Sequence, residues 1–126
     1  IGLLDENFFL LHEDADWCLR NLGRGYENIV VPEAVVYHKG SKTSRDFSEL
    51  THYYSVRNFL YLSHKNARGV NRVAAGCGFF LLSIKNLLKF MFGNREEHRM
   101  ARVFFDASFD YLRGTMGKVR VPTQKR

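Results

Sequence analysis

The sequence predicts an α/β fold, in the form of an α+β fragment followed by a mainly α-helical extension. Two short apolar runs, 28–31 and 34–38, have the alternation and β-branched composition of strands, and they follow an amphipathic helical stretch. From about residue 47 onwards, apolar residues recur at helical spacing instead. We therefore divide the chain into a mixed region, 1–46, and a basic helical region, 47–126.

Composition and charge limit the classes of function. Hydrophobic residues make up 45% of the 126 residues and aromatic residues 14%, enough for one packed core, so overall disorder is excluded. Residues 1–38 have a net charge of −5 and residues 39–126 a net charge of +11. Clustered acids suit proton transfer or metal binding, and a basic, aromatic-rich segment suits a membrane, nucleic acid or polyphosphate. The chain begins with Ile, and we expect it to be a piece of a longer protein.

The stretch 13–23 is predicted to form a helix with an acidic first turn, where the helix dipole favours negative charge. On a helical wheel Asp14 lies at the edge of the apolar stripe, half shielded, whereas Asp16 can pair with Arg20 four residues on. An oriented carboxylate such as Asp14 can take a proton from a hydroxyl. The alternative is that Glu13, Asp14 and Asp16 only complement the dipole, and spacing alone favours that alternative.

His38 ends the second predicted strand, and strand ends are where open α/β folds place their sites. A lone histidine there is more often hydrogen-bonded to backbone than bound to a metal, so the residues alone leave both roles open. Cys18 and Cys77 lie far apart with apolar neighbours, which favours free thiols in a reducing compartment. We therefore expect a cytoplasmic protein, with contact to the inner face of the plasma membrane.

Three helices are predicted after the polar loop, at 47–66, 71–92 and 95–113. The second contains a charge-free run, 73–84, that is too short to span a bilayer. Two interpretations stay open for it. It is either a core helix or an interfacial helix with Phe79, Phe80 and Phe90 in lipid and Lys85 and Lys89 at the headgroups.

The segment GLLDENFFLLHEDADWCLRNLGRGY, followed by VPEAVVYHKG, resembles the second half of the catalytic domain of family 2 glycosyltransferases. It is most similar to the rhamnosyltransferase-like branch that builds bacterial surface polysaccharides. The matching residues are Gly2, Asp5, Glu6, Phe8, Phe9, Glu13, Asp14, Asp16, Leu19, Arg20, Gly25, Tyr26, Pro32, Ala34 and His38. Further on, Tyr54, Arg57 and Asn58 are similar to the family's Tyr-x-x-Arg-Asn.

The resemblance implies the C-terminal half of a GT-A nucleotide-sugar transferase fold. It implies that Asp14 is the catalytic base that deprotonates the acceptor hydroxyl, with Glu13 as its acidic partner. The reaction would be a single displacement with inversion, from a nucleotide-diphosphate sugar to a saccharide or lipid-linked acceptor. Such enzymes act in cell-surface polysaccharide or glycolipid synthesis.

The resemblance also implies sites for substrate and metal. Trp17, Asp16 and Arg57 are predicted to contact substrate. His38 is predicted to help ligate a divalent metal, Mg²⁺ or Mn²⁺, that neutralises the departing diphosphate in the complete enzyme.

The sequence departs from the family in one respect. The nucleotide-binding half, with its Asp-x-Asp motif, does not precede these residues, so we expect this chain alone to be inactive. The alternatives are a basic, aromatic-rich nucleic-acid-binding module or a structural module at a membrane surface. Because no recognised nucleic-acid motif is present, we predict no nucleic-acid partner.

Overall fold

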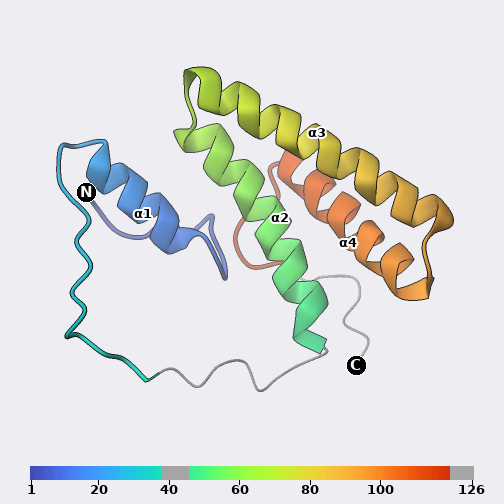
Figure 1. Ribbon diagram of the computed structural model, residues 1–126, viewed down its shortest axis with the longest axis horizontal. Coiled ribbons are helices and arrows are strands. Elements are labelled where there is room, and N and C mark those ends of the chain that lie inside the picture. The colour runs from blue at the N-terminus through green and yellow to red at the C-terminus, as the bar shows by residue number, and fades with distance from the viewer. Residues whose placement is uncertain (38–45, 120–126) are drawn as a thin grey trace.

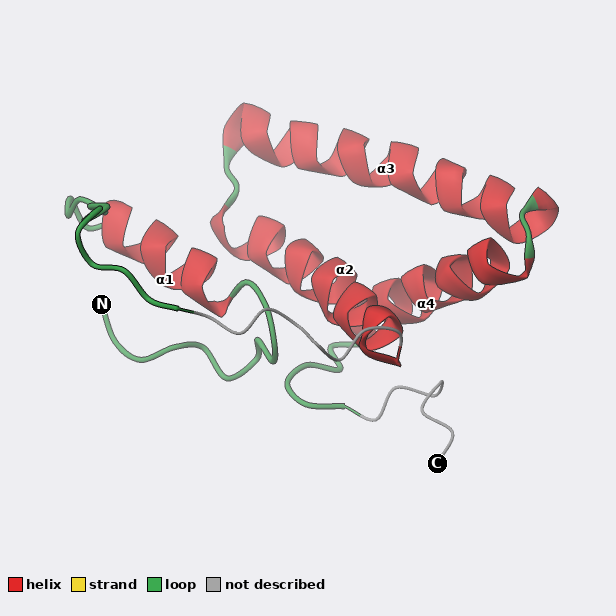
Figure 2. Ribbon diagram, turned by 60° about the horizontal axis from the view of Figure 1, so that its bottom comes forward, coloured by secondary structure: helices red, strands yellow, loops and turns green. Residues whose placement is uncertain are grey.

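The computed structural model describes residues 1–37 and 46–119, and over these residues it contains four helices and no strand (Figures 1 and 2). The helices are α1 (Glu13–Leu22), α2 (Asp46–Asn66), α3 (Gly69–Phe92) and α4 (Arg95–Leu112). Helix α4 packs against both α2 and α3, and α1 lies beside α2. The division of the chain into 1–46 and 47–126 stays a prediction.

The prediction of an α/β fold, and with it of a GT-A fragment, is wrong for the described residues, because the two apolar runs form no strands. They lie in an extended segment that runs apart from the helices (Figure 1), where Val30 and Val36 are each 85% exposed. β-branched residues favour extended backbone, but a strand also needs a neighbour that takes up its hydrogen bonds. Pro32 stands in a turn closed by the Ala34 N–H and the Val31 carbonyl, and the described chain offers these runs no partner strand.

The predicted helices are confirmed to within a few residues at each end. Helix α4 begins at a capping box: the Asn94 side chain accepts hydrogen bonds from the backbone N–H groups of Glu96 and Glu97. The Glu97 carboxylate accepts one in return from the Asn94 N–H, at 3.2 Å. This pairing satisfies backbone N–H groups that the first turn of a helix otherwise leaves without partners. It explains why a new helix, α4, begins here and α3 does not continue.

The core lies between α2 and α4. Tyr53, Tyr54, Val103 and Ala107 are fully buried there, and the rings of Tyr53 and Tyr54 meet edge to face at 5.2 Å. The Tyr53 hydroxyl donates to the Asp110 carboxylate, so its polar end is satisfied within the core. The core therefore joins α2 firmly to α4.

Helix α3 takes little part in this core, because none of its residues is buried. It is 24 residues long, and its length and composition would allow it to cross a membrane. The prediction that this segment is too short to do so counted only the charge-free residues 73–84, whereas the helix extends further at both ends.

Candidate functional site

Three consecutive residues immediately before α1 adopt left-handed backbone conformations, although none of them is glycine. Their φ angles are 56° at Leu10, 80° at Leu11 and 71° at His12. For residues with bulky side chains this conformation costs on the order of 1–2 kcal/mol each. Such a run persists only where the surroundings hold it, and strained backbone of this kind concentrates at functional sites.

Asn58 of α2 holds this run in place. Its side-chain Nδ2 donates to the carbonyl oxygens of Phe9, Leu10 and Leu11, at 3.3, 3.2 and 2.9 Å. Its Oδ1 accepts from the Arg57 guanidinium at 3.0 Å. Asn58 is fully buried, so these bonds are shielded from water and fix the backbone that leads into α1.

Arg57 extends the same support to the segment after α4. Its guanidinium donates to the carbonyls of Gly117, at 2.8 Å, and Thr115, at 3.4 Å, and it reaches the Asn7 carbonyl at 3.5 Å. It lies 4.8 Å from the centre of the Tyr54 ring. The Tyr-x-x-Arg-Asn residues thus form one buried clasp. The guanidinium predicted to contact substrate is fully buried, with its donors bonded inside the protein.

The clasp places His12, Glu13 and Asp14 together at the N-terminus of α1. Asp14 is exposed, not half shielded as the helical wheel predicted, and its Oδ1 accepts the Ala15 N–H at 2.7 Å. The His12 Nε2 and the Glu13 Oε2 are buried but have no hydrogen-bond partner in the described part of the chain. Buried polar atoms are normally bonded, so two neighbouring unpartnered atoms are an unusual feature of this end of α1.

Trp17 stands one helical turn after Asp14, on the same side of α1. It is half-buried, and its indole Nε1 donates to the Gly2 carbonyl at 3.3 Å. An amphipathic ring next to an exposed carboxylate gives this end of α1 an apolar surface beside a proton acceptor.

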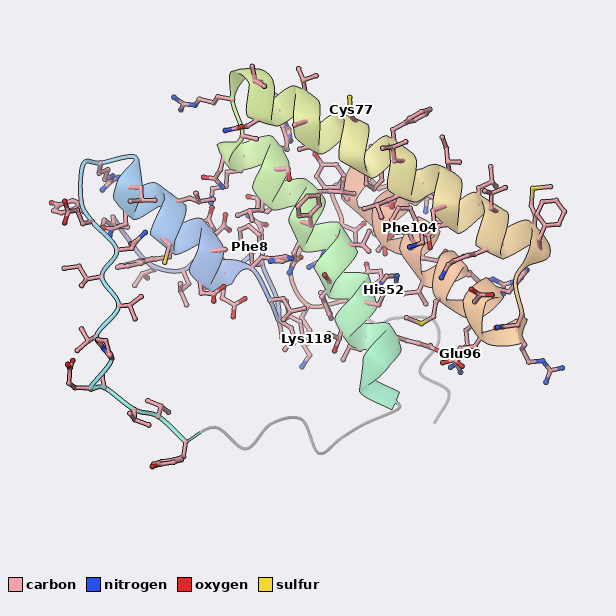
Figure 3. The ribbon with its side chains drawn as sticks, in the orientation of Figure 1. Phe8, His52, Cys77, Glu96, Phe104 and Lys118 are labelled. Carbon is pink, nitrogen blue, oxygen red and sulfur yellow. The ribbon has the colours of Figure 1, made fainter. Side chains whose placement is uncertain are left out.

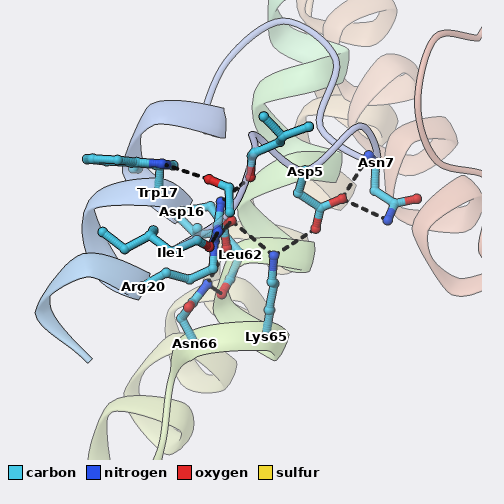
Figure 4. A network of polar contacts seen from close by, with 12 residues as sticks. Ile1, Asp5, Asn7, Asp16, Trp17, Arg20, Leu62, Lys65 and Asn66 are labelled. Atoms are coloured by element: carbon cyan, nitrogen blue, oxygen red, sulfur yellow. Dashed lines mark hydrogen bonds and ion pairs between the residues drawn. The ribbon is translucent and has the colours of Figure 1, made fainter. Parts of the chain in front are cut away.

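Asp16 points to the opposite side, into a polar network between α1 and α2 (Figure 4). It is fully buried and accepts from Arg20 at 2.9 Å, Lys65 at 3.0 Å and Asn66 at 3.1 Å. The predicted ion pair with Arg20 is confirmed. Burial raises the pKa of Asp16, but hydrogen bonds from Asn66, Lys65 and Arg20 outweigh it, so the pKa is lowered. This carboxylate joins two helices.

Asp5 completes the network from the N-terminal loop. Its carboxylate accepts from Lys65 at 2.7 Å and from the Tyr61 hydroxyl at 3.0 Å. Burial raises its pKa, but hydrogen bonds from Lys65, Asn7 and Tyr61 outweigh this effect and lower the pKa to about 2. Lys65 therefore bridges two ionised carboxylates and holds the N-terminal loop, α1 and α2 together (Figure 4).

The predicted metal ligand, His38, lies outside the described residues. Among residues 1–37 and 46–119, no three His, Cys, Asp or Glu side chains come together in a group that could hold a metal ion. The described residues therefore do not by themselves fit a divalent metal, and we assign them no metal-dependent step.

Sequence reasoning missed the role of Asn58 in this site. The left-handed run contains no glycine, so no residue type marked it. The one available signal was the similarity of Asn58 to the family's Tyr-x-x-Arg-Asn. That similarity marks Asn58 as a residue of interest but does not say which backbone groups it bonds.

Comparison with known proteins relates part of the chain to a glycosyltransferase. The chain is 32% identical over 74 residues to the dTDP-rhamnosyl transferase RfbF of Shigella flexneri, a match that covers 52% of the chain and 25% of that relative. The chain thus spans about a quarter of the length of this relative. No protein-family model matches the chain. No solved structure matches it either.

Proposed function

We propose that this chain is part of a family 2 glycosyltransferase, in which Asp14 is the general base that activates the acceptor hydroxyl. The partial likeness to a rhamnosyl transferase supports the reaction class. The observation that carries the role of Asp14 is the strained run Leu10–His12. Buried Asn58 holds this run so that an exposed carboxylate begins α1.

In the proposed reaction the Asp14 carboxylate accepts the proton of an acceptor hydroxyl. The oxygen of that hydroxyl then forms a bond to the anomeric carbon of the donor sugar. The bond from this carbon to the diphosphate breaks, the diphosphate leaves with the electron pair, and the configuration inverts. A positioned base of this kind contributes about 10²–10⁴-fold to the rate.

Neighbouring residues have supporting roles in this proposal. Glu13, next to Asp14 in the chain, is proposed as the acidic partner of the base, and its buried Oε2 lies beside the buried His12 Nε2 at this end of α1. Trp17 offers its ring one turn away as a surface for the acceptor. Asp16 and Arg57 support the site from behind, through bonds made inside the protein.

The donor, a nucleotide-diphosphate sugar, is proposed to bind mainly to residues outside this chain. The match covers a quarter of the relative, so most of a complete transferase of that size lies beyond it. We therefore propose that these 126 residues alone do not transfer sugar. A divalent metal at the diphosphate, with His38 among its ligands, remains part of the proposal for the complete enzyme.

The test is the Asp14→Asn substitution in the complete enzyme, with turnover and donor binding measured separately. Turnover should fall by about 10²–10⁴-fold while donor affinity is unchanged. Glu33→Gln is the matched control, because Glu33 is also an exposed acid and lies away from α1. Turnover of Asp14→Asn within a few-fold of the control would overturn the assignment.

A further inference from the structure

Helix α3 has its apolar side turned away from the protein. Leu81, Leu82, Leu87 and Phe92 are exposed on other parts of the helix. Seven further exposed residues recur every three or four positions and form one row: Val70, Val73, Cys77, Phe80, Ile84, Leu88 and Met91. We call these seven residues the outward face of α3. Val70 is 82% exposed and Phe80 65% exposed, and Cys77, near the middle of the helix, points away from α2 and α4 (Figure 3). A continuous apolar stripe of this length on a protein surface indicates a binding surface.

The opposite side of α3 attaches the helix to α4 through two aromatic contacts. The Phe79 ring stacks on Phe104 at 5.5 Å between centroids, and the Phe90 ring stacks on His98 at 4.2 Å. Between these contacts the half-buried positions include Ser83 and Asn86, which bond to carbonyls of α3 itself. Phe79 and Phe90, which only the interfacial interpretation placed in lipid, therefore contact α4, and the outward face is made by other residues.

The charges of α3 favour a lipid surface over a second copy as the occupant of this face. Its charged residues are Arg72, Lys85 and Lys89, and it contains no acid. By the helical step of about 100° per residue, Lys85 flanks the outward face, whereas Arg72 and Lys89 lie towards the opposite side, where Lys89 pairs with Glu97 of α4. A second copy docked on this face would offer Lys85 no acid to pair with, because α3 contains none. An anionic lipid surface would instead neutralise Lys85, while its alkyl stem extends along the apolar stripe.

The packing of α4 sets the orientation of the helix. Glu97 pairs with Lys89 at 3.4 Å, and Arg102 and Asp106 also lie on α4. Immersing the α3–α4 pair in hydrocarbon would bury these charges, at a cost of several kcal/mol. A helix that keeps α4 at its back must therefore lie in the plane of the interface.

We propose that the outward face of α3 docks on an anionic lipid bilayer, with the helix axis in the plane of the membrane. The apolar side chains would enter the boundary between headgroups and acyl chains, as in other interfacial helices. Lys85 would lie at the headgroup level. This inference concerns a different surface from the Asp14 site and does not depend on transferase activity.

The first experiment is flotation of the 126-residue chain with phosphatidylcholine vesicles, with and without one-third phosphatidylglycerol. We expect binding to the anionic vesicles that weakens several-fold at high salt but does not vanish, because the apolar contribution is not screened. The double variant Phe80→Ser/Leu88→Ser should lower the partition coefficient at least tenfold. The matched control is Phe109→Ser/Leu112→Ser, which also removes an exposed Phe and an exposed Leu, from α4, and should change it less than twofold.

All four residues are exposed, so neither variant should unfold the chain, and circular dichroism checks this. Equal loss of binding in both variants, or equal binding of the wild type to both kinds of vesicle, would overturn the proposal. So would a stable dimer in sedimentation equilibrium that the α3 variant abolishes, because a second copy would then be the occupant.

The second experiment reports the orientation of α3. A polarity-sensitive fluorophore is attached to Cys77 in a Cys18→Ala background, since Cys77 is exposed and Cys18 is half-buried. We expect a blue shift with anionic vesicles, and stronger quenching by nitroxides near the headgroups than by nitroxides at the chain ends. Strongest quenching at the bilayer centre would mean that α3 crosses the membrane, and no shift would mean that the face does not meet lipid. Either result would overturn the proposal.

Discussion

Helices α2 and α3 are similar in length, at 21 and 24 residues, but they differ in how far they bury their side chains. Helix α2 fully buries an arginine and an asparagine, whereas the more apolar α3 buries none of its residues. A polar group can be buried when each of its hydrogen bonds is made inside the protein, and an apolar group stays outside when nothing covers it. Burial in this chain therefore follows the available partners and not hydropathy alone.

The strongest test of this comparison removes a buried polar side chain from α2. Arg57→Ala leaves the carbonyls of Thr115, Gly117 and Asn7 without their donor and opens a cavity beside the Tyr54 ring. Hydrogen bonds to a charged group contribute about 1.5–3 kcal/mol each. We expect the free energy of unfolding to fall by about 3–5 kcal/mol, measured by urea titration with Trp17 fluorescence.

Arg24→Ala is the control, because Arg24 is exposed, and its effect should stay within about 0.5 kcal/mol. If both variants unfold at the same urea concentration, the guanidinium of Arg57 does not stabilise the fold and the comparison with α3 fails.

A second test uses acid, because the α1–α2 contact depends on ionised carboxylates and α3 contains none. The pKa of Asp5 is lowered from its ordinary value of 3.8 to about 2. A carboxyl with a lowered folded-state pKa stabilises the protein above its unfolded-state pKa, and this contribution is lost as the pH falls towards the folded-state value. We expect the contribution of Asp5 to the free energy of unfolding of the wild type to fall by about 2 kcal/mol between pH 4 and pH 2.

Urea titrations across this pH range measure the effect. At pH 6 the free energy of unfolding of Asp5→Asn should be lower than that of the wild type. On acidification to pH 2 it should fall by less than the wild-type value does. The exposed neighbour Glu6 provides the control, and Glu6→Gln should follow the wild-type curve. Parallel curves for wild type and Asp5→Asn would show that the network does not depend on the charge of Asp5.

The helices were predictable because their signals are local. The change to helical spacing, the acidic first turn of α1 and the Asn94–Glu97 capping box each act within a few residues. The runs 28–31 and 34–38 carry equally local strand signals, but a strand depends on a partner elsewhere, and sequence spacing says nothing about that partner.

The candidate site shows the same limit. The spacing of the acids at the start of α1 indicated an acidic first turn and left their role open, and the Asp16–Arg20 pair follows from an i to i+4 rule. The clasp was not predictable, because Asn58 meets Phe9–Leu11 across nearly fifty residues of sequence. For the same reason the burial of Arg57, and its bonds to the carbonyls after α4, required the three-dimensional arrangement.

The smallest predicted effect concerns α3 itself. Because this helix buries no residue, its stability should depend on intrinsic helix propensity more than that of α2 does. A Cβ added at Gly78 would meet nothing within 4 Å, so Gly78→Ala should raise the free energy of unfolding by about 0.5–1 kcal/mol. Gly93→Ala is the contrast, since its Cβ would overlap the Lys89 carbonyl oxygen and should lower stability. Urea titration of both variants measures the difference, and a Gly78→Ala variant no more stable than the wild type would mean that α3 frays independently of the α2–α4 core.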